Sequence, residues 1–357
     1  MVWENPNGGE RLRADPGTVA PEPRVFCTRP LPGRGLQRLA ERAELDVWPG
    51  PGAPSPCELL ERTRDAEGLL CLLTDSIRSE LIANCPRLRV ISSCSVGLDH
   101  IDVAAASARG IPVGFTPGVL VETTADLAFG LLLASARRIP EAERFLRTGQ
   151  WSWERRWEPE LLLGGDVHGA TLGLIGLGAI GQAVARRAAG FDMRLLGWTR
   201  SGRRVPGVEL VTFDALLRES DLVSLHVALT PETRGLIGAS QLAQMRSGAF
   251  LVNTSRGGVV DELALLHALE SGHLGGAALD VFAVEPIDPS SPLLRAPNLI
   301  LTPHIGSASI ATRTRMADLA VENLLAGLEG RPLPACANPK DGAGDDGGAI
   351  PDSAPSG

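Results

Sequence analysis

Short runs of apolar and β-branched residues recur along the chain, and stretches with helical spacing separate them. In the first third of the chain these runs predict strands at residues 24–28, 44–48, 68–73, 88–93 and 111–115. Strands that alternate with helices favour parallel pairing, because each crossover returns the next strand to the same direction. The pattern therefore predicts an α/β domain built on a parallel sheet.

A long amphipathic stretch at residues 121–149 follows, with Leu127, Leu131 and Leu132 on one face, and we expect it to be a connector. A second βαβ series then begins. Its expected elements are strands at 171–176, 193–198, 222–227, 249–254, 277–281 and 299–302 and a helix at 180–191. Asp261 is expected to cap a helix that ends before Gly272. A last helix at 310–329 is expected to cross back to the first domain. Two doubly wound parallel-sheet domains with a cleft between them are the predicted fold.

Composition agrees with two domains, since 357 residues with 44% hydrophobic side chains can bury a sizeable core. A net charge of −8 argues against a nucleic-acid surface. The six cysteines form no CxxC pair and no zinc-like cluster, which favours a reduced chain without a metal site. No leader or long apolar segment is evident, so we expect a cytoplasmic protein that does not enter a membrane. Residues 1–23 and 335–357 are rich in Pro, Gly and charge, and we expect them to be disordered.

A GxGxxG element directly follows the predicted strand at 171–176 and opens a predicted helix, which is the context that a dinucleotide-binding turn requires. Its residues are Gly176, Leu177, Gly178, Ala179, Ile180 and Gly181. The glycines permit a tight turn, a close approach to pyrophosphate and close packing of helix on sheet, and the helix N-terminus stabilises the anion. The alternative, an ordinary turn, does not explain this placement.

The end of the next strand distinguishes NAD from NADP, because NAD sites usually place an acid there to bind the ribose 2′-hydroxyl. This sequence has no acid at that point. The segment instead offers hydroxyls and guanidinium groups from Thr199, Arg200, Ser201 and Arg203. These groups suit a 2′-phosphate, although a solvated basic loop is the alternative. We therefore expect NADPH, with NADH possible.

Three polar residues follow strands of the second series: Arg256, Glu285 and His304. In open parallel sheets ligands bind beyond the carboxyl ends of the strands, so these side chains can converge on one crevice. Reduction of a 2-keto acid needs a hydride donor, a proton donor and a cation for the substrate carboxylate. A carboxylate beside His304 would fix its tautomer and favour its protonated form. Each residue taken singly also suits a structural role, and only their joint placement favours catalysis.

Five ordered motifs resemble the D-isomer-specific 2-hydroxyacid dehydrogenases, most of all the glyoxylate and hydroxypyruvate reductases of animals. They lie at residues 93–100, 176–181, 255–257, 280–286 and 303–307, and the likeness spans residues 24–334. The resemblance implies a catalytic set of Arg256, Glu285 and His304. It implies reduction of glyoxylate to glycolate and of hydroxypyruvate to D-glycerate, with the preferred acid left open.

The resemblance also implies binding roles. Backbone N–H groups of Val96 and Gly97 would hold the substrate carboxylate, and Ser307 would line the same pocket. The residues implied for the cofactor cleft are Ala228, Thr233, Thr254, Asp280 and Gly306. Trp153 would reach the active site of a neighbouring subunit, or else pack in a dimer interface, and either role implies a homodimer.

Family architecture implies a flavodoxin-like substrate domain at residues 24–119 and 310–334, with a Rossmann domain at 120–309 inserted between its parts. A phosphoglycerate dehydrogenase would share this fold, but a regulatory domain would be expected after Pro334. A formate dehydrogenase would be expected to use NAD. A dinucleotide-sensing corepressor-like protein would retain the same triad, although NADH sensing favours an acid after the second strand. NADPH preference separates the reductase from that binding protein.

Overall fold

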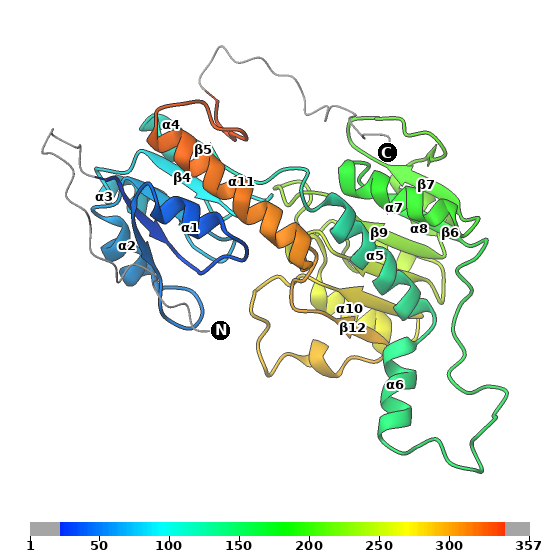
Figure 1. Ribbon diagram of the computed structural model, residues 1–357. Coiled ribbons are helices and arrows are strands. Elements are labelled where there is room, and N and C mark those ends of the chain that lie inside the picture. Colours follow the sequence, from blue (N-terminus) through cyan, green and yellow to red (C-terminus); the bar gives the residue numbers. More distant parts are fainter. Residues whose placement is uncertain (1–21, 340–357) are drawn as a thin grey trace, which may run out of the picture.

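Two parallel β-sheets, each flanked by helices, form the described part of the computed structural model, residues 22–339 (Figure 1). The first sheet has the order β2-β1-β3-β4-β5, and all of its pairs are parallel. Its strands are β1 (Arg24–Cys27), β2 (Glu44–Val47), β3 (Gly68–Cys71), β4 (Val90–Ser93) and β5 (Val113–Gly114). Its helices are α1 (Gly35–Ala40), α2 (Pro56–Thr63), α3 (Ser79–Asn84) and α4 (Val103–Ala108). This strand order is the flavodoxin-like order that the sequence predicts.

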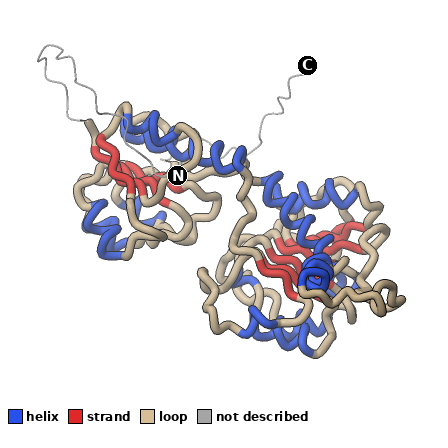
Figure 2. Tube along the Cα trace, turned by 60° about the horizontal axis from the view of Figure 1, so that its bottom comes forward, coloured by secondary structure: helices blue, strands red, loops and turns tan. Residues whose placement is uncertain are grey.

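The second sheet has the order β12-β11-β10-β9-β6-β7-β8, so the direction of winding reverses between β6 and β9, as in a Rossmann domain. Its strands are β6 (Thr171–Ile175), β7 (Arg194–Trp198), β8 (Glu209–Leu210), β9 (Leu222–Leu225), β10 (Phe250–Asn253), β11 (Gly276–Leu279) and β12 (Leu299–Leu301). Helices α7 (Ala179–Ala189), α8 (Phe213–Glu219), α9 (Ala239–Gln244) and α10 (Glu262–Glu270) accompany it. Short 3-10 turns lie at Gly257–Val259 and Pro292–Arg295. Figure 2 shows the two sheets as separate bodies.

The predicted strands all exist, and each is shorter than expected: most lose their last residues to a loop, whereas β4 and β7 end where predicted and begin later. The prediction missed β8, whose two residues are both exposed and therefore leave no apolar signal. The predicted cap of α10 is confirmed, since the Asp261 carboxylate accepts from the N–H groups of Leu263 and Ala264, both at 3.1 Å. Gly272, at φ 69°, then ends that helix region.

The stretch predicted as one connector is two helices, α5 (Val121–Ala136) and α6 (Ile139–Arg147). Arg138 lies between them with φ 51°, a left-handed conformation that interrupts a helix. The first of these helices also packs into the second domain, because Phe129 and Leu132 are buried with Leu172 in its core. Helix α5 therefore belongs to that core.

Helix α11 (Ile310–Leu328) crosses back to the first domain, as predicted, and lies along its sheet (Figure 1). Val321 and Leu324 are fully buried against Val25 and Leu70 of that sheet. The chain crosses between the domains at the starts of α5 and α11. These two helix starts are in contact, because the hydroxyls of Thr123 and Thr312 lie 2.6 Å apart. The chain thus passes between its domains twice at one place.

The expected end of the folded chain at residue 334 is too early. Ala337 donates its N–H to the Val113 carbonyl at 2.8 Å, and Cys336 bridges to Gly114 in antiparallel fashion. The Asn338 side chain accepts from the Val113 N–H at 2.8 Å. Residues 335–339 therefore extend the edge of the first sheet. The rest of the expected tail and residues 1–21 lie outside the described residues. Between residues 22 and 339, no helix is both long and apolar enough to cross a membrane.

Candidate active site

The glycine-rich turn joins β6 to α7 at the point where the winding of the second sheet reverses. Gly176 has φ 98°, and a Cβ added there would lie 2.4 Å from the His226 carbonyl oxygen. A Cβ on Gly181 would lie 2.2 Å from the Gly176 carbonyl oxygen. Only glycine fits these contacts, which bring the first residues of α7, Ala179 and Ile180, against the strand end. Their N–H groups lack intrahelical acceptors and are available to an anion.

Two features of this crevice fit a bound dinucleotide. A Cβ added to Gly178 would meet no atom within 4 Å, so the backbone is open on the side where pyrophosphate approaches in such turns. The Thr254 hydroxyl, at the end of β10, is buried and has no hydrogen-bond partner among the described residues. A buried hydroxyl without a partner is costly unless a ligand completes its bonding. The residues present therefore suit a nicotinamide dinucleotide.

The arginine-containing loop after β7 is exposed, and the Thr199 and Ser201 hydroxyls lie 3.2 Å apart within it. Arg200 donates from Nη1 to Glu232 Oε2 at 3.4 Å, a pair that sequence reasoning missed. A hydrogen bond from the Thr230 hydroxyl, with a smaller contribution from Arg200, holds the pKa of Glu232 below its usual value. An acidic residue, Glu232, does lie near the loop after β7, but it comes from the segment after β9 and pairs with Arg200.

Ala228 and Thr233 lie in the loop after β9, and they differ in exposure. Ala228 is exposed, whereas the Thr233 side chain is buried and donates its hydroxyl to the Ala228 carbonyl at 2.6 Å. The same hydroxyl accepts from the Thr230 N–H at 2.8 Å. Thr233 therefore shapes the loop that presents Ala228 and does not expose its own side chain.

His304 and Glu285 form a hydrogen-bonded pair, with Nδ1 of the imidazole 2.7 Å from Oε2 of the carboxylate. An ionised carboxylate only accepts hydrogen bonds, so Nδ1 carries the proton and Nε2 is left for the substrate. Glu285 Oε1 accepts from the Phe282 N–H at 2.9 Å. Burial raises the pKa of Glu285, but these hydrogen bonds and the charges of His304 and Arg256 outweigh it, and the net shift is downward.

Asp280 anchors the loop that carries His304. Its carboxylate is fully buried and accepts from the Thr302 hydroxyl at 2.6 Å and from the N–H groups of Ile305 and Gly306, both at 2.8 Å. Burial raises the pKa of Asp280 in spite of these bonds. The sequence suggested a contact with nicotinamide, and it gave no sign of this anchoring role. Ser307, next to Gly306 in the same loop, is partly exposed.

Arg256 reaches from the second domain to the loop after β4 in the first. It donates from Nε to Asp99 Oδ2 at 2.8 Å, and from Nη1 to the Ser255 carbonyl at 2.8 Å. A Cβ on Gly97 would lie 1.6 Å from Arg256 Nη2, so this glycine is what admits the guanidinium. The prediction placed Arg256 and Gly97 in one site but missed Asp99, which lies 157 residues away from Arg256 in sequence.

A chain of buried hydroxyls holds the loop that carries Val96 and Gly97. Ser93 Oγ lies 3.0 Å from His100 Nε2 and 2.7 Å from Ser95 Oγ, and Ser95 donates to the Gly97 carbonyl at 2.8 Å. Burial lowers the pKa of His100 to about 4, so this histidine is neutral. Uncharged groups, the serine hydroxyls and the neutral imidazole, therefore hold this loop in place.

Trp153 lies in the segment after α6 and is 76% exposed. The Arg156 guanidinium carbon lies 3.6 Å from the centre of its ring. Trp151 and Trp157, in the same segment, are also exposed, at 55% and 84%. All three tryptophans are exposed on the surface of the single chain, among charged residues of the same segment.

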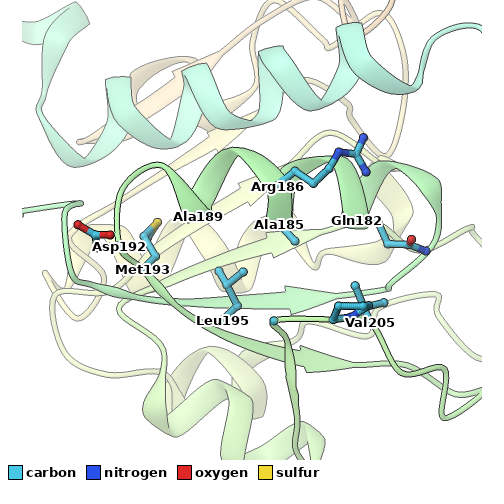
Figure 3. Close-up of a pocket in the computed structure, with 10 residues that line it drawn as sticks. Gln182, Ala185, Arg186, Ala189, Asp192, Met193, Leu195 and Val205 are labelled. Atoms are coloured by element: carbon cyan, nitrogen blue, oxygen red, sulfur yellow. The ribbon is translucent and has the colours of Figure 1, made fainter. Parts of the chain in front are cut away.

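A cavity of about 640 Å³ lies outside the catalytic crevice, along α7 and the start of β7. Gln182 and Val205 lie at one end of it, and Asp192 and Met193 lie at the other (Figure 3). None of the catalytic residues lines it. No helix lies in the described residues 199–208 between β7 and β8, and loop residues 205–207 form the side of the cavity that faces α7.

A dinucleotide-binding turn and a histidine–carboxylate pair at the ends of one parallel sheet define a nicotinamide-dependent dehydrogenase. Residues 129–306 match the family model "D-isomer specific 2-hydroxyacid dehydrogenase, NAD binding domain". A glyoxylate reductase of Korarchaeum cryptofilum is 50% identical over 321 residues, which cover 89% of this chain and 96% of that protein. The chain therefore belongs to the D-isomer-specific 2-hydroxyacid dehydrogenase family, as its motifs indicated.

Solved structures agree with this assignment. A protein of Thermus thermophilus is 50% identical with a TM-score of 0.83, over 88% of this chain and 99% of that one. An NADPH-dependent glyoxylate/hydroxypyruvate reductase of Sinorhizobium meliloti, in complex with NADP and malonate, is 35% identical with a TM-score of 0.79, over 88% and 96% of the two chains.

Proposed function

We propose that the protein reduces glyoxylate to glycolate and hydroxypyruvate to D-glycerate, with NADPH as the preferred donor. The observation that carries the proposal is the His304–Glu285 pair, in which Nδ1 and Oε2 lie 2.7 Å apart. The charge of Arg256 contributes to the lowered pKa of Glu285. These residues supply a proton donor and a carboxylate-binding cation to one crevice. Reductases of both acids among the related proteins support this choice of substrates.

In the proposed reaction Arg256 and the N–H groups of Val96 and Gly97 bind the substrate carboxylate, and Ser307 lines the pocket. When bound, the nicotinamide supplies a hydride to the carbonyl carbon. His304 donates its Nε2 proton to the carbonyl oxygen, which becomes the hydroxyl. Glu285 stabilises the imidazolium before this transfer and keeps the ring in place during it. Hydride and proton together complete the two-electron reduction.

Cofactor preference in this proposal rests on the loop after β7. Arg200 and Arg203, with the hydroxyls of Thr199 and Ser201, would bind a 2′-phosphate. Glu232 pairs with Arg200 at 3.4 Å, and both side chains are more than half exposed, so solvent weakens the pair and Arg200 can turn to the phosphate. NADH would bind without that contact and would be used less well.

We further propose that residues 24–119 and 310–339 form the substrate domain and residues 120–309 the cofactor domain. The exposed tryptophans after α6 support a homodimer, in which Trp153 would approach the partner subunit's crevice or pack in the interface.

The test is the oxidation of NADPH and NADH, followed at 340 nm, by wild type and by Arg200→Ala with each acid. We expect wild type to prefer NADPH and Arg200→Ala to raise the KM for NADPH about tenfold or more, since a hydrogen bond to a charged group contributes ~1.5–3 kcal/mol. The KM for NADH should change little. Arg218→Ala is the matched control, because Arg218 is equally exposed in its own surface ion pair. Preference for NADH, or turnover of neither acid, would contradict the proposal.

A further inference from the structure

Asp99 has no part in the proposed reaction, yet its carboxylate lies at the crevice. Its Oδ2 accepts from Arg256 Nε at 2.8 Å, and it is separated from Gly97 by a single residue. About half of its side chain is exposed, compared with 31% for Arg256. The pair joins one domain to the other. The Asp99 carboxylate binds the Nε edge of the guanidinium, and Nη2 faces Gly97.

Both basic side chains of the predicted catalytic set already contact a carboxylate. Arg256 lies 2.8 Å from Asp99, and His304 lies 2.7 Å from Glu285. A further cation, Arg78, donates to the Asp99 main-chain carbonyl at 3.0 Å, but its side chain is exposed and its charge is screened by solvent. One substrate carboxylate can use the N–H groups of the loop and the free edge of Arg256. A second negative charge on the substrate would lie near the Asp99 carboxylate, which repels it.

We propose that Asp99 restricts the site to 2-keto acids that carry a single negative charge. Asp99 holds Arg256 by Nε and repels any second carboxylate or phosphate on the substrate. The inference deepens the proposed function, on which its kinetic test rests. Repulsion between like charges a few ångströms apart in a partly buried site disfavours a dianion by a factor on the order of ten to a hundred.

The first experiment compares kcat/KM for glyoxylate with kcat/KM for oxaloacetate, which carries a second carboxylate. In Asp99→Asn an amide oxygen can still accept from Arg256 Nε, but the negative charge is gone. We expect the oxaloacetate-to-glyoxylate ratio of kcat/KM to rise at least tenfold in this variant. Asp99→Ala loses both the charge and the acceptor, and its kcat/KM for glyoxylate should fall at least tenfold below that of Asp99→Asn. Activity on glyoxylate that is lost in Asp99→Ala but kept in Asp99→Asn would separate the two roles of Asp99, the positioning of Arg256 and the exclusion of a second negative charge.

Asp102→Asn is the matched control. It removes one charge from the same segment, and Asn can replace the Asp102 carboxylate that caps α4 by accepting from Ala105 at 2.9 Å. This variant should leave the substrate ratio as in wild type. An unchanged ratio in Asp99→Asn, or an equal rise in Asp102→Asn, would overturn the inference.

A binding measurement keeps the inference separate from the proposed function. Oxamate and oxalate have nearly the same shape and carry one and two negative charges at neutral pH. Calorimetry with the NADPH-loaded protein should give tighter binding of oxamate than of oxalate in wild type, with the difference reduced at least tenfold in Asp99→Asn. Equal binding of the two anions by wild type would overturn charge selection. If oxamate is preferred but no 2-keto acid is reduced, the proposed function fails and the charge selection stands.

Discussion

Two ion pairs face the crevice, and they are built in different ways. Glu285 and His304 both follow strands of the second sheet, and local backbone bonds hold them to Phe282 and Asp280. Asp99 and Arg256 come from different sheets, and their contact at 2.8 Å exists only while the domains meet. The proton-donating half of the site is therefore preformed within one domain, whereas the anion-binding half is assembled from two.

This difference gives each half its own kinetic signature. A change at His304 or Glu285 should alter the proton transfer and therefore kcat, whereas a change in the loop of the first sheet should alter substrate binding and therefore KM. The chain crosses between the domains where α5 and α11 begin, at the Thr123–Thr312 contact.

The largest expected effect comes from His304→Ala, which removes the proton donor. We expect kcat to fall by ~10²–10⁴, the usual contribution of general acid catalysis, with NADPH binding retained as measured by fluorescence titration. His168→Ala is the control, because His168 also pairs with a carboxylate, Asp192, at 3.2 Å, but on the exposed surface. If His304→Ala keeps more than about a tenth of wild-type kcat, the preformed half does not supply the proton.

The sequence allowed this preformed half to be predicted, because its residues follow strands and the ends of parallel strands meet. The glycine-rich turn was predictable for the same reason. Asp99 and Glu232 were missed because each joins an arginine from a distant segment, a pairing that local patterns do not encode. The helix break at Arg138 was missed although Pro140, a common first-turn residue, marks the start of α6.

A smaller effect is expected from Glu285→Gln, which keeps the shape of the pair but removes its charge. We expect kcat to fall about a hundredfold and the KM for glyoxylate to change little, because the substrate carboxylate is bound by the other half. The pKa of Glu285 is lowered. In wild type the carboxylate is therefore ionised, and the ion pair fully formed, above the usual carboxylate pKa, and the ion pair is lost as the pH falls through the lowered pKa of Glu285.

The pH profile of kcat checks this assignment. Glu285→Gln should lose the acid limb that Glu285 sets, and its alkaline limb should move to lower pH because the imidazolium has lost its counter-charge. A profile identical to wild type, or a loss confined to KM, would show that the two halves are not separable in this way.

The smallest effect is expected from Ser95→Ala in the substrate loop, and it should appear in KM. Ser95 is buried and links the Ser93 hydroxyl to the Gly97 carbonyl, so its loss loosens the N–H groups that bind the carboxylate. One net hydrogen bond contributes ~1 kcal/mol, which corresponds to a rise of about fivefold in the KM for glyoxylate. Ser271→Ala, at an exposed serine of the second domain, should leave KM unchanged. Because the pKa of His100 is about 4, the chain of hydroxyls and imidazole that holds this loop is uncharged at neutral pH, and the rise in KM should be the same from about pH 6 upward. A fall in kcat with unchanged KM would instead mean that the loop acts on the proton donor, and the distinction between a preformed and an assembled half would fail.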